Sequence, residues 1–184
     1  MPAYSDDELV RQLNLIAHDR HRATDHAQHL CYTALPTLSP SDIRAAEKQL
    51  GFDLPPLLRR LYTEVGNGGF GPGCGLLPLI LPHIEGTVVD EYLQRRETPS
   101  QNELQSLHFL LPIIDNDCGV FICLLLQESG DASPPVVTYE PNLSSEESTR
   151  RYLAECPFVG KGLIPMKKSL HAWLGDWLRA RQRN

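Results

Sequence analysis

The chain has 184 residues, of which 41% are hydrophobic and 22% charged, as is typical of one soluble globular domain. Its longest apolar run, Val120 to Leu126, is far shorter than the roughly 20 residues that a membrane-spanning helix needs, so we expect no membrane partner. The formal net charge of −6 divides into −12 over residues 1–149 (9 basic, 21 acidic) and +6 over residues 150–184 (8 basic, 2 acidic), and a mostly acidic chain argues against a nucleic-acid partner.

The first predicted element is a helix over residues 6–17, whose leucines and isoleucine recur at spacings of four and three on one side. Residues 18–36 are mostly polar, so we expect a helical extension at most and then a linker. We therefore divide the chain into an N-terminal helix and polar linker, residues 1–37, and a main domain, residues 38–184, which together form one globular unit.

The clearest helix signal in the sequence begins at Ser39. This serine can cap a helix, Pro40 suits the first helical position, and Asp42 completes an arrangement like a capping box. Apolar residues then recur at helical spacing until Gly51, which provides a left-handed end. A second helix is predicted over residues 56–65, where leucine, tyrosine and valine cover one face and a glycine follows.

Residues 66–75 (GNGGFGPGCG) form a loop with six glycines, which we call the glycine loop. Gly66, Gly68 and Gly71 have the G-x-G-x-x-G spacing of a dinucleotide site. That site needs a strand before the motif and a helix after it, whereas here a helix is predicted before it and a strand after it. We therefore interpret the loop as a tight connection in which glycines adopt positive φ.

The rest of the chain mixes strands and helices. The predicted strands cover residues 76–81, 107–114, 120–127 and 136–140, and the predicted helices cover residues 87–96 and, after the cap Ser169, residues 170–178. Pro78 places the first of these strands near an edge, and the turn at residues 115–119 joins the next two in a buried hairpin. Residues 141–157 are interpreted as a long connection. Because βαβ units do not repeat, we predict a single α+β domain with a largely antiparallel sheet flanked by helices.

Four histidines, His18, His21, His26 and His29, would bring two or three imidazoles to one side of a continuous helix, with Cys31 just beyond. Structural zinc sites usually draw their ligands from two separate elements, and charged residues interleave these histidines. We favour a solvated polar face here, and we predict no metal and no other cofactor.

The chain has five cysteines, an odd number, widely spread and without C-x-x-C: Cys31, Cys74, Cys118, Cys123 and Cys156. This pattern indicates reduced, mostly buried thiols. The acidic start of the chain also lacks the pattern of an export signal, so we expect a cytoplasmic location. No G-x-S-x-G motif is present and no cysteine is marked as activated by a histidine, so we predict no enzyme activity.

Asp115 and Asp117 flank Asn116 in the predicted hairpin turn. Paired carboxylates at a strand end are able to do acid–base chemistry or to bind a cation, but the remaining spacing of a calcium loop is absent. Aspartate and asparagine side chains commonly bond the neighbouring backbone in turns. We interpret these residues as turn formers.

The stretch Leu38 to Pro55 (LSPSDIRAAEKQLGFDLP) resembles the opening signature of the SUKH superfamily (SMI/KNR-like family), in which a helix ending in Glu-x-x-Leu-Gly precedes Leu-Pro. Later parts of that family's pattern are similar, in the expected order, to residues 57–65, 67–71, 75–79, 115–126 and 169–174, so the resemblance covers residues 38–178. It departs at the hairpin turn, where the family often places an aromatic residue and a glycine after the aspartate, and this chain has Asn116 and Asp117.

The resemblance implies binding rather than catalysis. Bacterial members of the superfamily are largely immunity proteins that neutralise a cognate toxin, often a nuclease or a deaminase, and fungal relatives regulate cell-wall glucan synthesis. The residues that match the family's fold-defining positions are Glu47, Gly51, Pro55, Gly68, Gly69 and Trp173.

We therefore expect an immunity protein whose acidic face covers the active site or substrate groove of a basic toxin. The candidate contact residues are Asn67, Phe70, Asp115 and Asp117, because loops present polar and aromatic groups on a rigid scaffold. A regulatory or scaffolding module is the alternative, and solubility is the simpler explanation of the acidic composition. The sequence is also compatible with a homodimer, because either a loop or a second copy of the chain can cover the edge of the hairpin.

Overall fold

The structure is a computed structural model that describes residues 4–19, 21–25, 33–97, 109–126, 133–140 and 162–182. Its helices are α1 (Asp6–Ala17), α2 (Pro40–Leu50), α3 (Pro56–Arg60), the π-helical turn η1 (Leu61–Val65), α4 (Val88–Glu97) and α6 (Leu170–Arg181). Its strands are β1 (Leu110–Asp115), β2 (Phe121–Leu125), β3 (Val136–Tyr139) and β4 (Leu163–Lys167). The strands form one antiparallel sheet in the order β1-β2-β3-β4, which confirms the predicted α+β fold.

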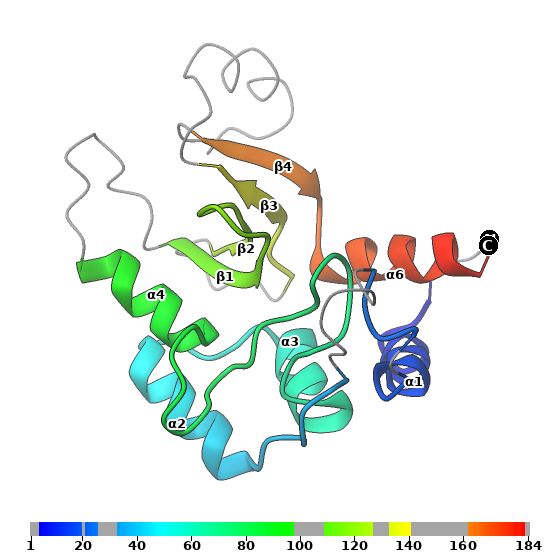
Figure 1. The fold of residues 1–184 in the computed structure, drawn as a ribbon, viewed down its shortest axis with the longest axis horizontal. Helices are drawn as coiled ribbons and strands as arrows, with labels where there is room; N and C mark the ends of the chain where they lie inside the picture. The colour runs from blue at the N-terminus through cyan, green and yellow to red at the C-terminus, as the bar shows by residue number, and fades with distance from the viewer. Residues whose placement is uncertain are drawn as a thin grey trace.

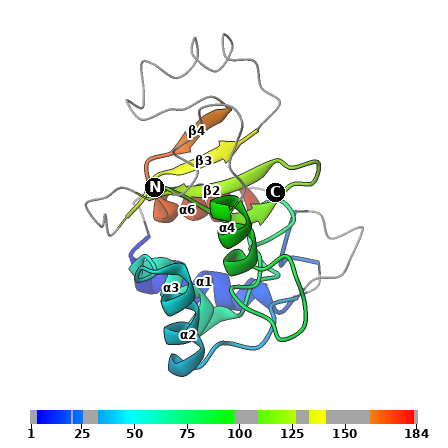
Figure 2. The same cartoon turned by 90° about the vertical axis from the view of Figure 1, so that its left-hand side faces the viewer.

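The helices α1, α2 and α3 lie together on one side of the sheet, and the two views in Figures 1 and 2 agree on this separation. α4 packs against β1, while α6 packs against both β4 and α1. α1 also contacts η1. The first and last helices of the chain therefore pack together beside the sheet.

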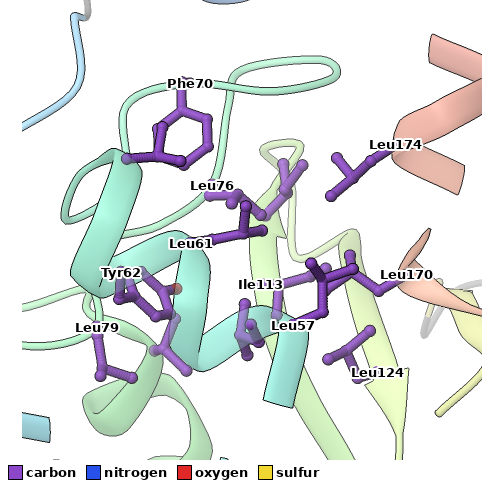
Figure 3. Packing of buried hydrophobic residues seen from close by; sticks show 14 of the residues in the cluster. Leu57, Leu61, Tyr62, Phe70, Leu76, Leu79, Ile113, Leu124, Leu170 and Leu174 are labelled. Atoms are coloured by element: carbon purple, nitrogen blue, oxygen red, sulfur yellow. The ribbon is translucent and has the colours of Figure 1, made fainter. Parts of the chain in front are cut away.

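Both faces of the sheet are buried over most of β1, β2 and β3, whereas β4 is half-buried to exposed beyond Leu163. Leu111 and Ile113 of β1 and Leu124 of β2 belong to the main core cluster with the helices (Figure 3). A second buried cluster contains Leu110, Phe121, Cys123, Leu125, Val137, Tyr139 and Leu163. Strands that are buried on both faces are apolar without alternation, which explains why this hairpin was recognisable as two continuous apolar runs.

α2 begins and ends as the sequence predicts. The Ser39 hydroxyl accepts a hydrogen bond from the Asp42 N–H at 3.3 Å, and the Asp42 carboxylate accepts one from the Ser39 N–H at 3.0 Å. The hydrogen bonds from Ser39 hold the pKa of Asp42 below its usual range. At the other end Gly51 has φ +86° and donates its N–H to the Glu47 carbonyl. The capping box and the left-handed end are both confirmed.

The predicted strand over residues 76–81 is wrong. Its backbone groups bond to several separate parts of the molecule instead of to one neighbouring strand: Leu76 pairs with Gly69 and Phe70, Leu77 donates to Ile113, Pro78 accepts from Val88, and Asn67 holds Leu79 and Ile80. Pro78 has no N–H to contribute to a ladder. The segment is an extended connection that joins the glycine loop to β1 and α4.

Two smaller differences concern the ends of elements. The helix predicted over residues 56–65 is α-helical only in its first part, because Gly66 donates to the Leu61 carbonyl and the last turn is a π-helix. β4 was not predicted. Pro165 interrupts its sequence, and the strand is defined by its pairing with β3 rather than by an apolar pattern of its own.

Candidate partner-binding surface

The glycine loop folds into the protein rather than out of it. Asn67 is 2% exposed and Phe70 is fully buried, at 0%. Phe70 packs in the main core with Leu61 and Leu76 (Figure 3). The side chains of Asn67 and Phe70 are therefore not accessible to a partner in this structure, and we withdraw both from the candidate contact residues.

Asn67 has a structural place instead. Its side-chain amide donates to the Ile80 carbonyl at 2.8 Å, and its side-chain oxygen accepts from the Leu79 N–H at 2.8 Å. These two bonds substitute for a strand partner beside residues 79–80. A polar side chain in a glycine-rich loop predicts exposure to solvent. The buried role of Asn67 becomes visible only in the structure, which places residues 79–80 within hydrogen-bonding distance of its amide.

The hairpin turn, residues 115–119, faces outward. Residues 116–119 are exposed and Asp115 is half-buried. The Asp115 carboxylate accepts from the Asp117 N–H at 2.8 Å, and the Asn116 N–H donates to the Val120 carbonyl at 2.9 Å. The predicted turn-forming role of Asp115 is thus confirmed, and it leaves the rest of the turn free to contact another molecule.

The backbone of this turn is unusual at two residues that are not glycine. Asp117 has φ +67° and Cys118 has φ +53°. Aspartate tolerates the left-handed region better than most residues, but glycine adopts it without a penalty. Asp117 stands where the family that this chain resembles often has glycine. This chain therefore carries a charged side chain at a position whose left-handed backbone favours glycine.

The carboxylates of the turn also lack an ion-pair partner among the described residues. Most acidic side chains in the described part of the chain form ion pairs with Arg, Lys or His: Asp6, Asp7, Glu8, Asp25, Glu47, Asp53, Glu64, Glu91 and Asp176. Neither Asp115 nor Asp117 forms an ion pair with a described residue. The turn therefore presents two neighbouring negative charges that are not neutralised by a cation within that set.

The tip of the glycine loop lies against this turn. A Cβ atom placed on Gly73 would be 3.3 Å from Asn116 Oδ1. Burial raises the pKa of the Cys74 thiol, and the carboxylates of Asp117 and Asp115 raise it further. We call residues 72–74 and 115–118 together the two-turn surface.

The residues matched to fold-defining positions lie in the scaffold. The Glu47 carboxylate is 8% exposed and accepts from the Leu54 N–H at 2.8 Å and from Arg59 Nη2 at 2.5 Å, which joins α2 to α3. Pro55 is the cap residue of α3, and Trp173 of α6 is buried in the main core. Cβ atoms on Gly68 and Gly69 would lie 2.6 Å from the Leu76 and Thr33 carbonyl oxygens, respectively.

The described residues include two of the four clustered histidines. His18 and His21 are exposed, whereas His26, His29 and Cys31 lie outside the described residues, as does Cys156. Within the described ranges, no three His, Cys, Asp or Glu side chains are grouped so that they could hold a metal ion. Cys74, Cys118 and Cys123 are free thiols there, but the prediction of mostly buried thiols is wrong for two of them, because Cys74 is half-buried and Cys118 is exposed. Cys123 is buried, and burial raises its pKa to about 12. None of the described helices has the length and apolar character of a membrane span.

The molecule is thus an α+β domain with a buried glycine loop beneath an exposed acidic turn. The chain belongs to the SMI1 / KNR4 family (SUKH-1), whose model matches residues 37–156. Membership confirms the resemblance found in the sequence, and it supports a general role as an immunity or regulatory protein-interaction protein in a family whose members are generally non-enzymatic. Among curated proteins none matches the chain.

Proposed function

We propose that this protein is an immunity protein that binds a cognate toxin domain of a polymorphic or contact-dependent system and neutralises it by covering its active site or substrate groove. A nuclease or a deaminase is the expected toxin class. The toxin domain has a basic surface where it meets this chain, and the complex forms in the cytoplasm. No catalytic step by this protein is required.

The carboxylates of Asp115 and Asp117, which form no ion pair with a residue that the structure describes, carry the proposal. An exposed charge without an internal partner adds nothing to the fold through ion pairing, and it is available to a cation on another protein. A toxin that handles nucleic acid holds its substrate phosphates with Lys and Arg, so two adjacent carboxylates on a firm turn suit the same groups. The family membership supports protein binding as the mode of action.

The test is a capture experiment followed by a functional one. The tagged protein is incubated with native cytosol and with extracts of cells that express the adjacent open reading frames, and bound proteins are identified by mass spectrometry. We expect one stoichiometric partner with a C-terminal toxin domain. Co-expression of that domain with this protein must then restore growth of cells that the toxin alone kills.

The matched variants change charge and little else. Asp115→Asn with Asp117→Asn keeps the turn's side-chain acceptors and the tolerance of positive φ, and removes two charges. The control, Asp53→Asn with Glu85→Gln, removes two exposed charges elsewhere. On the captured toxin domain we expect the first pair to slow association about tenfold at low salt and to weaken its salt dependence, and the control to change neither.

A regulatory or scaffolding module is the second candidate, and it is favoured by the family's general role. It predicts several endogenous signalling or housekeeping partners and no toxin. Recovery of such partners alone would favour this candidate over immunity. Equal association rates for both variant pairs on a genuine toxin partner would show that the turn is not the interface.

A further inference from the structure

Asp25 lies outside the family match, between α1 and α2, at a point where three distant segments meet. Its carboxylate accepts hydrogen bonds from the Gly73 N–H at 2.8 Å and from Trp177 Nε1 at 2.8 and 3.0 Å. It also accepts from Arg181 Nη1 at 2.7 Å, in an ion pair. One short side chain therefore holds the glycine loop and the last turns of α6 at the same time.

The backbone around Asp25 is joined to the glycine loop as well. Gly71 donates to the Ala23 carbonyl at 2.7 Å, and Asp25 donates to the Gly73 carbonyl at 3.1 Å, so that Thr24 and Gly71 form a parallel bridge. A Cβ on Gly75 would be 2.9 Å from Thr24 Cγ2, which leaves no space between the two segments. The loop is thus held along its length by residues 23–25.

Residues in the last turns of α6 fix the position of Asp25. Arg181 donates to the Thr24 carbonyl at 3.3 Å as well as to Asp25, and its guanidinium lies 4.8 Å from the centre of the Trp177 ring. Charge-assisted bonds of this kind are stronger than neutral ones. Asp25 is therefore fixed from one side by α6 and acts on Gly73 from the other.

Gly73 lies beside the hairpin turn. It lies in a tight turn closed by the Gly75 N–H and the Pro72 carbonyl at 3.0 Å, and a Cβ on it would be 3.3 Å from Asn116 Oδ1. A continuous path of contacts therefore runs from α6 through Asp25 and Gly73 to Asn116. Asp115 and Asp117 lie on either side of that asparagine.

We propose that Asp25 is a positioning residue for the two-turn surface: by fixing Gly73 it holds the tip of the glycine loop against the hairpin turn, so that Asp115 and Asp117 are presented in a preformed arrangement. The inference rests on the proposed function for its use in binding. A surface that is ordered before binding loses less conformational freedom when the partner arrives, and it holds the partner longer.

The test uses the full chain and hydrogen exchange measured by NMR at single amides. In Asp25→Ala we expect the Gly73 amide to exchange at least about tenfold faster, with faster exchange at Asn116 and Asp117, while amides of α2 keep their rates. Asp25→Asn keeps an acceptor for Gly73 and is expected to restore much of the protection. Asp19→Ala, which among the described residues removes only a side-chain bond to the nearby His21 N–H, is the matched control and is expected to change none of these amides.

Two results would overturn the inference. One is unchanged protection of Gly73, Asn116 and Asp117 in Asp25→Ala. The other is a uniform loss of protection that includes α2, because this would mean that Asp25 supports the fold as a whole. If Asp25→Ala lowers stability too far to interpret, Trp177→Phe removes one donor to Asp25, keeps an aromatic ring, and must loosen the same amides to a smaller extent.

A binding measurement separates this inference from the proposed function. On the captured toxin domain, Asp25→Ala should raise the dissociation rate about tenfold and keep most of the salt dependence of association, because the charge it removes is paired with Arg181 while the charges of Asp115 and Asp117 stay in place. Loss of charge at Asp115 and Asp117 without any effect on association removes the hairpin turn from the proposed interface, whatever Asp25 does to the loop. A normal dissociation rate in Asp25→Ala, with association still sensitive to those two charges, overturns this inference alone.

Discussion

The glycine loop and the hairpin turn touch each other, but their hydrogen bonds go to different places. The loop bonds to several segments outside itself: Leu35 and Gly68 pair by backbone, Asn67 holds residues 79–80, and Gly71 donates to the Ala23 carbonyl. The bonds of the hairpin turn stay within residues 115–120. One connection therefore helps to build the fold, and the other only closes two strands.

This difference indicates where the sequence is free to change. A substitution in the glycine loop disturbs several segments at once, whereas a substitution in the hairpin turn affects the hydrogen bonds of its immediate neighbours. A family that keeps one scaffold and meets different partners needs both kinds of connection. The expected effects of substitution are therefore large and on stability in the loop, and small on stability in the turn.

The largest expected effect is on Gly68. Its φ is +82°, and a Cβ would be 2.6 Å from the Leu76 carbonyl oxygen and 2.7 Å from Leu77 and Pro78 backbone atoms. Because these are backbone atoms that cannot rotate away, Gly68→Ala should destabilise the protein by about 3 kcal/mol or more. The measurement is urea unfolding followed by circular dichroism.

Gly51→Ala is the matched control for this effect. Gly51 has a similar φ of +86°, but nothing lies within 4 Å of a Cβ there. It should lose only the left-handed preference, about 1 kcal/mol. Equal losses for the two variants would contradict the close approach of residues 68 and 76–78 and would leave backbone preference as the sole cause.

The next effect contrasts the two asparagines. Asn67→Ala leaves a buried N–H and a half-buried carbonyl without the partner that Asn67 provides, and should destabilise the protein by about 2–4 kcal/mol. Asn116→Ala, in the exposed turn, should change stability by no more than about 0.5 kcal/mol. Unfolding curves of both variants, recorded side by side, check the prediction. A similar small change in both would mean that the amide of Asn67 does not hold residues 79–80 in solution.

The same contrast explains what the sequence was able to predict. α2 is specified by neighbours in sequence: the serine cap, the proline, the acidic third residue and the terminal glycine are all local signals, and each was found where predicted. The hairpin was equally clear, because two apolar runs with a polar turn between them need no distant information.

The errors share a physical cause, which is the weight of contacts distant in sequence. Asn67 is a polar residue of the kind usually found at the surface, and it is buried because its amide pairs with the Leu79 N–H and the Ile80 carbonyl. β4 exists through its pairing with β3, and Pro165 interrupts the short apolar run that would otherwise have indicated a strand. Asp25 looks like one more charge in a polar linker, and its contacts with Gly73 and Trp177 depend on how the ends of the chain meet.

A smaller effect is expected at Asp117, and in the opposite direction. Asp117→Gly relieves the left-handed φ of +67° and should stabilise the protein by about 0.5–1 kcal/mol. Asp117→Asn removes the same charge but keeps the side chain in the left-handed region, so it should leave stability nearly unchanged. Thermal unfolding distinguishes the two. If both variants stabilise equally, the repulsion between Asp115 and Asp117 is the cause, and not the backbone.

The smallest effect tests whether the two connections meet in solution. Burial and the carboxylates of Asp117 and Asp115 raise the pKa of Cys74, and the thiolate is the form that reacts. Removing a neighbouring negative charge favours the thiolate, so Asp117→Asn should shift the rise of Cys74 alkylation with pH toward lower pH. Iodoacetamide labelling resolved by peptide mass spectrometry reads Cys74 apart from the other four cysteines.

Glu85→Gln is the control, since this exposed carboxylate is not among the groups that raise the Cys74 pKa. It should leave the pH profile of Cys74 unchanged. An unchanged profile in Asp117→Asn as well would place the tip of the glycine loop away from the hairpin turn. The hairpin turn would then be separate from the glycine loop, and Gly73 would not contact Asn116. In that case the loop would not help to position the carboxylate of Asp117.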